Sequence, residues 1–212
     1  ISVPVGLMTS IYLVEYGRGR IAKAITFFVD VMTGIPSIVA GLFIYAVFSL
    51  IFKPGISMGI MGALALAVLM TPVVVRGSEE LLKIVPNELR EASYALGVPK
   101  WLTILKVVLP TSIAGITTSV MLAISRVIGE TAPLLLTAGF TQSLNTTIFS
   151  GQLMTLPVFA YNQHMNQGPN PDAPLAPAWA PALTLILTLM VLNPPPRLAA
   201  QVSASYVPRP AP

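Results

Sequence analysis

Charged residues are absent from four long stretches of the chain. These stretches cover residues 31–52, 54–75, 107–125 and 173–196, and residues 1–14 form a shorter fifth one. An apolar helix needs about 20 residues to cross the hydrocarbon core of a bilayer. Only 9% of the 212 residues are charged, whereas about a quarter are charged in a soluble domain. The sequence therefore excludes a water-soluble globule and predicts an all-α integral membrane protein.

A single transmembrane domain is predicted over residues 1–193. Its five expected spans are residues 1–16, 25–52, 57–76, 111–137 and 179–193. We expect a cytoplasmic loop at 77–110, an external loop at 138–176 and a disordered Pro-rich tail at 194–212. Because the chain opens on Ile1 rather than Met, we interpret its start as lying inside a span.

The basic residues fix the expected orientation. If residues 15–24 are cytoplasmic, alternation of the spans leaves Lys53 as the one basic residue outside. The inside then holds Arg18, Arg20, Lys23, Lys83, Arg90, Lys100, Lys106, Arg197 and Arg209. This bias is the positive-inside rule, so the net charge of +4 indicates membrane topology and no nucleic-acid partner.

Metal sites built from Cys or several His residues are excluded. The chain contains no cysteine and one histidine, so neither thiolate ligands nor a multi-histidine site is available. No metal ligand and no cofactor of this chain itself are expected.

Two features of the spans predict close or irregular helix packing. Pro36 removes a hydrogen bond from the second span and predicts a kink. Either the kinked segment lies beside the pore, or the kink only improves helix packing. In the third span the small residues Gly59, Gly62, Ala63, Ala65 and Ala67 allow helices to approach closely in lipid. These features predict a helix bundle or a multi-chain assembly.

The cytoplasmic loop predicts two short amphipathic helices. Pro86 begins the first helix, Gly97 ends it at the C′ position, and Pro99 opens the second. One face of the first helix carries Leu89, Ala92, Ser93 and Leu96. This apolar face is expected to be buried against another surface, either a partner protein or the membrane.

Part of this loop resembles the signature of bacterial binding-protein-dependent ABC import permeases. That signature is Glu-Ala-Ala, three residues, Gly, nine residues, Ile, one residue and Leu-Pro. The matching positions here are Glu91, Ala92, Ser93, Gly97, Val107, Leu109 and Pro110, with departures at Ser93 and Val107. The resemblance implies that residues 86–98 form a coupling helix that docks on a separate ATPase subunit, which binds ATP and Mg²⁺. The alternative is that this helix lies on lipid headgroups, although helices at a membrane surface are usually basic.

Further stretches resemble the A-type permeases of high-affinity phosphate importers, the Pst family. They are Thr33 to Leu42, Val74-Val75-Arg76 with Glu79, and Ala123 to Leu135. The resemblance implies a multi-pass subunit of the bacterial inner membrane and a sixth span in the complete protein. It also implies four kinds of partner: a homologous second permease, two copies of the ATPase, a periplasmic or lipid-anchored phosphate-binding protein, and phosphate itself. The Pro-Pro-Pro run at 194–196 departs from the family's C-terminus.

Two pairs of charged residues stand within or at the end of spans. Arg76 and Glu79 are three residues apart and Arg126 and Glu130 four apart, so each pair is expected on one helix face. Charges inside a bilayer are costly and must face protein or water, and a guanidinium can hold phosphate by two hydrogen bonds. The hypothesis is that both arginines guide phosphate while both glutamates tune the field. The alternative is that the pairs only hold helices together.

Catalysis by this chain alone is not expected. It lacks the phosphate-binding loop Gly-x-x-x-x-Gly-Lys-Ser/Thr, the His-Glu-x-x-His motif and the Gly-x-Ser-x-Gly motif, so ATP hydrolysis and common protease chemistry lack their groups. The alternatives are a permease for another oxyanion such as sulfate or molybdate, an intramembrane enzyme using Glu130, and a non-transporting assembly subunit.

Overall fold

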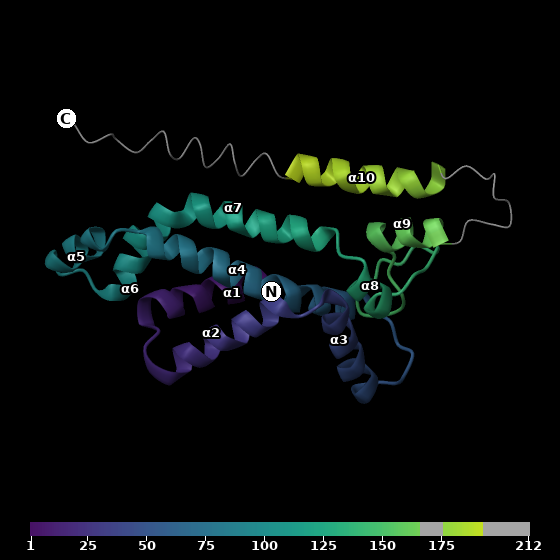
Figure 1. Cartoon of the computed structure of the whole chain (residues 1–212), viewed down its shortest axis with the longest axis horizontal. Coiled ribbons are helices and arrows are strands. Elements are labelled where there is room, and N and C mark those ends of the chain that lie inside the picture. Colours follow the sequence, from purple (N-terminus) through teal and green to yellow (C-terminus); the bar gives the residue numbers. More distant parts are fainter. Residues whose placement is uncertain (166–175, 193–212) are drawn as a thin grey trace. The chain divides into compact units, whose positions relative to one another are not determined.

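The computed structural model describes residues 1–165 and 176–192, and all regular elements in those ranges are helices (Figure 1). The predicted all-α class is confirmed. The elements are α1 Ser2–Ile11, the π-helical turn η1 Tyr12–Tyr16, α2 Gly19–Gly34, α3 Ser37–Ile51, α4 Gly59–Ile84, α5 Asn87–Ala95, α6 Lys100–Thr103, the π-helical turn η2 Ile104–Val108, α7 Leu109–Ile128, α8 Ala132–Thr137, α9 Leu156–Met165 and α10 Ala176–Leu192. The predicted tail at 194–212 lies outside the described residues.

Within the described ranges, two helical stretches are long and apolar enough to cross a membrane. They are Gly59–Ile84, with 26 residues, and Lys100–Ile128, with 29. The pair α2 and α3 makes a third crossing if it is counted as one span. Helix α10 is apolar but has 17 residues, which cover about 26 Å at 1.5 Å per residue, short of the ~30 Å hydrocarbon core.

The expected second span, residues 25–52, is two helices. Helix α2 ends at Gly34 and α3 begins at Ser37, with a bend at the break. Pro36 stands at the N-cap of α3 with an extended ψ of 137° and has no N–H to continue the hydrogen-bond ladder. The proline therefore interrupts the span instead of kinking a continuous helix.

Helical structure extends into both ends of the expected loop at 77–110. Helix α4 continues to Ile84, and a new helical stretch starts at Lys100 and runs through Pro110 into α7. Pro110 has no N–H to donate, and it stands just after the π-helical turn η2 Ile104–Val108, where the α-helical hydrogen-bond ladder is already interrupted. The fourth expected span, residues 111–137, also differs from the prediction. It is two helices, because α7 stops at Ile128 and α8 is a separate helix.

The described helices belong to two compact units. One combines Ile1–Val31 and Thr71–Ile124, and the other combines Met32–Met70 and Ser125–Val191. The first unit has a core of Leu82, Val85, Val108 and Ile116. The second unit has one core around Ile44, Met61 and Ala65 and another around Leu134, Ala138 and Val158.

Small residues permit close helix contacts in the second unit. A Cβ added at Gly41 in α3 would stand 2.7 Å from the Cα of Pro133 in α8. At Gly62 in α4 the added atom would stand 3.0 Å from Leu134. The predicted role of small residues in packing is thus confirmed at Gly62, and also at the buried Ala65, whereas Ala63 is exposed.

Candidate functional site

Glu79 is the centre of an ion network on α4. Its side chain is 8% exposed and binds two cations of the same helix. Arg76 Nη1 donates to Glu79 Oε2 at 2.7 Å, and Lys83 Nζ donates to Glu79 Oε1 at 2.7 Å. The predicted pairing of Arg76 with Glu79 is confirmed, because residues three apart on a continuous helix are neighbours.

Asp30 joins the same network from α2. Its carboxylate accepts a hydrogen bond from Arg76 Nη2, so the Arg76 guanidinium is shared by two carboxylates. Asp30 is not among the site residues predicted from the sequence, although its position next to the charge-free stretch that starts at residue 31 marks it as a charge at a membrane boundary. With Lys83 included, two acids and two bases meet here, and the network has no net charge.

A cavity of about 390 Å³ opens beside this network in the first unit. Its charged lining residues are Lys23 and Asp30 on α2 and Glu79 and Lys83 on α4. Both carboxylates that hold Arg76 therefore face an accessible space, which meets the requirement that charges near a span contact protein or water rather than lipid.

Arg126 and Glu130 do not form the pair that their spacing predicted. Helix α7 ends at Ile128, so Glu130 lies beyond it, where its backbone N–H donates to the Val127 carbonyl at 3.1 Å. In the part of the chain that the structure describes, no ion pair joins the two side chains. The i,i+4 rule fails because it requires an uninterrupted helix. Arg126 is exposed in the last turn of α7.

The predicted coupling helix is α5, and its end has the expected geometry. Gly97 has φ +76°. Its N–H donates to the Tyr94 carbonyl at 2.9 Å, and the Val98 N–H donates to the Ser93 carbonyl at 3.2 Å. These two bonds define a Schellman motif with Gly97 at C′, which confirms the sequence prediction for this residue.

The signature residues divide into exposed and packed groups. Glu91 and Ala92 on α5 and Pro110 on α7 are exposed. Ser93 is buried, with its hydroxyl oxygen 2.8 Å from Thr103 Oγ1, and Leu109 packs against the core of the first unit. Val107 is half-buried in η2.

The apolar residues at positions 89 and 96 remain open to the surroundings. Leu89 is 42% and Leu96 is 83% exposed, so within residues 1–165 and 176–192 no other part of the chain covers these two side chains. Helices α5 and α6 lie beyond the C-terminal end of α4 (Figure 1). The packed residues hold the segment in place while the exposed ones are available to a partner.

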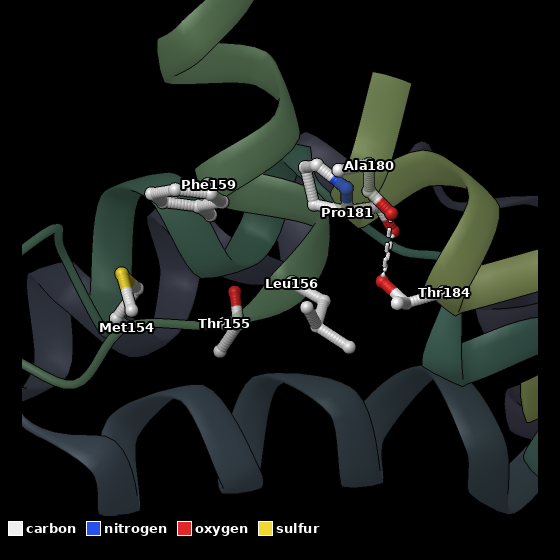
Figure 2. A pocket seen from close by; sticks show the side chains of 7 residues that line it. All are labelled: Met154, Thr155, Leu156, Phe159, Ala180, Pro181 and Thr184. Atoms are coloured by element: carbon white, nitrogen blue, oxygen red, sulfur yellow. Dashed lines mark hydrogen bonds between the residues drawn. The ribbon is translucent and has the colours of Figure 1, made fainter. Parts of the chain in front are cut away.

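A second cavity lies in the other unit and is mainly apolar. Figure 2 shows its lining, which comes from the segment Met154 to Phe159 and from Ala180, Pro181 and Thr184 of α10. The Thr184 hydroxyl donates to the carbonyls of Ala180 and Pro181 at 3.1 and 2.8 Å. The lining contains no charged residue, so nothing in it matches an anion site.

Residues 2–194 match the family described as the binding-protein-dependent transport system inner membrane component. The chain belongs to this family of membrane permeases. It is 47% identical over 194 residues to the phosphate transport system permease protein PstA 1 of Mycobacterium tuberculosis (strain ATCC 25618 / H37Rv), covering 91% of this chain and 61% of that protein.

Other comparisons agree with this assignment. The phosphate transport system permease protein PstA of Yersinia pestis is 41% identical over 198 residues, covering 91% of this chain and 64% of that protein. The chain thus spans less than two thirds of the length of both relatives. A chain of the MetNI methionine ABC transporter in an inward-facing conformation shares the fold, with a TM-score of 0.72 and 17% identity over 95% of this chain and 87% of that one.

Proposed function

We propose that this chain is a permease subunit of an ATP-driven importer of inorganic phosphate in the bacterial inner membrane. The observation that carries the proposal is the 47% and 41% identity, over 91% of the chain, to proteins named phosphate transport system permeases. The proposal includes a homologous second permease, two copies of a separate ATPase that bind ATP and Mg²⁺, and a periplasmic or lipid-anchored phosphate-binding protein. The permease chain holds no cofactor and catalyses no reaction by itself.

Helix α5 is the proposed contact with the ATPase. It presents Glu91, Ala92 and the exposed Leu89 and Leu96, while Ser93 fastens it to Thr103 on α6. ATP binding by the partner would move this segment, and the connected helices α4 and α7 would carry the movement into the membrane.

Arg126 is the proposed principal contact for phosphate. Its exposed guanidinium has no ion-pair partner among the described residues, so its fork is free for two phosphate oxygens. The nearby Glu130 offsets part of its field and keeps the anion from being trapped.

Arg76 is proposed to act differently, because Asp30 and Glu79 already hold its guanidinium. Phosphate can bind Arg76 only by displacing one of these carboxylates. We propose that Asp30 is displaced, since its side chain is 57% exposed and that of Glu79 is 8% exposed. Glu79 then keeps Arg76 in place.

The experiment that tests the substrate is uptake of labelled phosphate. Cells lacking their own phosphate permease receive the gene for this chain together with those of its partner subunits. We expect phosphate accumulation that requires this gene and that unlabelled phosphate competes away. Accumulation of sulfate or molybdate instead, by an assembled complex, would show that the substrate assignment is wrong.

Variants of Arg126 test the proposed path. Arg126→Lys keeps the charge but loses the fork, so we expect phosphate uptake to fall by roughly tenfold at an unchanged protein level. Lys106→Gln, an exposed basic residue of η2, is the control and should retain normal uptake. Full uptake by Arg126→Ala would contradict the proposed role.

A further inference from the structure

Glu15 is a nearly buried acid at the end of the first helix of the chain. It lies in η1, and its side chain is 5% exposed. Its Oε1 accepts a hydrogen bond from Arg90 Nε at 3.0 Å, and the two residues are 75 positions apart. Arg90 belongs to α5, so this ion pair joins the proposed coupling helix to an element with which it has no direct covalent connection.

Arg90 uses its remaining donors on the C-terminal end of α4 at Leu82, on Val85 just beyond it and on Asn87, the first residue of its own helix α5. Its Nη1 donates to the Val85 carbonyl at 2.6 Å and to Asn87 Oδ1 at 3.1 Å, while its Nη2 donates to the Leu82 carbonyl at 3.0 Å. The last carbonyls of a helix have no donors within the helix and carry its negative dipole end. One guanidinium therefore links η1, the end of α4 and α5.

Lys100 makes a second link to the same place. Its ammonium group donates to the backbone carbonyl of Glu15 and lies 4.7 Å from the centre of the Tyr16 ring, within cation–π range. Lys100 is the first residue of α6. Basic side chains from both α5 and α6, Arg90 and Lys100, therefore contact the end of η1.

Stability alone does not account for this arrangement. The Arg90 side chain is 12% exposed and that of Glu15 is 5% exposed, and at such burial the loss of hydration offsets most of the Coulomb attraction of an ion pair. What the pair does supply is a fixed geometry. The core of the first unit adds to this geometry, since Leu7, Ile11 and Val14 pack against the cluster of Leu82, Val85, Val108 and Ile116.

We propose that Glu15 is a positioning residue for coupling, which makes α1 and η1 move together with α5 as one rigid body. The proposal rests on the function proposed above. Movement of α5 would otherwise reach the membrane only through α4 and α7, the helices to which its segment is joined along the chain. Through Arg90 and Lys100, Glu15 adds the first helix to the moving part.

The first test compares Glu15→Gln with wild type in proteoliposomes that contain the complete transport complex. The amide keeps the shape and one acceptor but removes the charge. We expect the ratio of phosphate imported to ATP hydrolysed to fall by about fivefold, the size of effect that residues between coupled sites produce. Glu80→Gln, an exposed acid of α4, should leave the ratio unchanged.

The second test needs no transported solute. The chain lacks cysteine, so Arg18→Cys beside η1 and Ala95→Cys on α5, both at exposed positions, take spin labels selectively. We expect the mean distance between the labels to be the same with and without ATP. When Glu15→Gln is added, we expect the distribution of distances to broaden.

The outcomes separate the two proposals. If the wild-type complex imports no phosphate, the proposed substrate is wrong, and the label distances still test Glu15. If the label distance changes with ATP in the wild-type complex, or if Glu15→Gln keeps both the import ratio and the distance distribution, the positioning role is overturned.

Discussion

Gly97 shows how a backbone angle places a functional segment. Its φ of +76° belongs to the left-handed region, which is costly for residues with a Cβ. No atom lies within 4 Å of the position that a Cβ would take. The restriction on this residue is therefore conformational and not steric crowding by neighbours.

A substitution at Gly97 should uncouple transport without preventing membrane insertion. Gly97→Val would cost about 1–2 kcal/mol in the observed conformation, enough to shift α5 away from its Schellman end. We expect phosphate uptake to fall severalfold while ATP hydrolysis by the complex continues, measured at equal protein levels.

The matched control at this position is Gly97→Asn. Asparagine visits the left-handed region more readily than other residues with side chains, so it should retain much of the uptake that valine loses. Equal and normal uptake by both variants would show that the geometry of this helix end is not needed for coupling.

Helix α4 illustrates how close packing holds the first unit together. A Cβ added at Gly77 would stand 1.8 Å from Ser119 Oγ on α7, and one added at Gly115 would stand 2.7 Å from a methyl carbon of Leu81. Glycines on both helices thus bring α4 and α7 together beside the ion network of Glu79. Small residues allow this approach, which maximises van der Waals contact in lipid.

Adding one methyl group at this contact should destabilise the protein. Gly77→Ala forces Ser119 or the helices to move, at a cost of about 1–3 kcal/mol. We expect a lower thermal unfolding temperature in detergent, and recovery of most of the loss in the double variant with Ser119→Ala, because that change removes the colliding hydroxyl.

Gly34→Ala provides the comparison, since no atom lies within 4 Å of the added Cβ there. This variant should unfold at or above the wild-type temperature, because alanine favours a helix more than glycine does. A Gly77→Ala variant that loses equal stability with and without Ser119→Ala would contradict the proposed contact.

The distribution of charge over the chain predicts its orientation in the membrane. Lys53 follows α3 and Arg20 lies in the first turn of α2, and both are exposed. The excess of basic residues in the segments around Arg20 predicts that this side faces the cytoplasm. Because the chain has no cysteine, labelling of the purified chain reports only on the single cysteine that is introduced.

We expect Lys53→Cys to react with a membrane-impermeant maleimide in intact spheroplasts. Arg20→Cys should react only after the membrane is opened or in inverted vesicles. The reverse pattern would mean that the orientation is wrong, and with it the assignment of α5 to the ATPase side. Retained phosphate uptake by each variant is the control that the labelled protein is functional.

Features that depend on neighbours in the chain could be predicted from the sequence. The apolar stretches predicted helices, Gly97 predicted the end of α5, and the spacing of Arg76 and Glu79 predicted their ion pair. Each prediction depends on helix geometry within a few residues, so no knowledge of the tertiary packing was needed. The signature in the cytoplasmic loop likewise lies within one continuous segment.

Other features arise from packing between distant segments. Asp30 meets Arg76 across 46 positions, and Glu15 meets Arg90 across 75. Contacts at such separations follow from how the helices pack, and no local spacing rule specifies them. The same limit explains Arg126 and Glu130: their spacing favoured a pair, but α7 ends at Ile128, and with that end the two side chains no longer share a helix face.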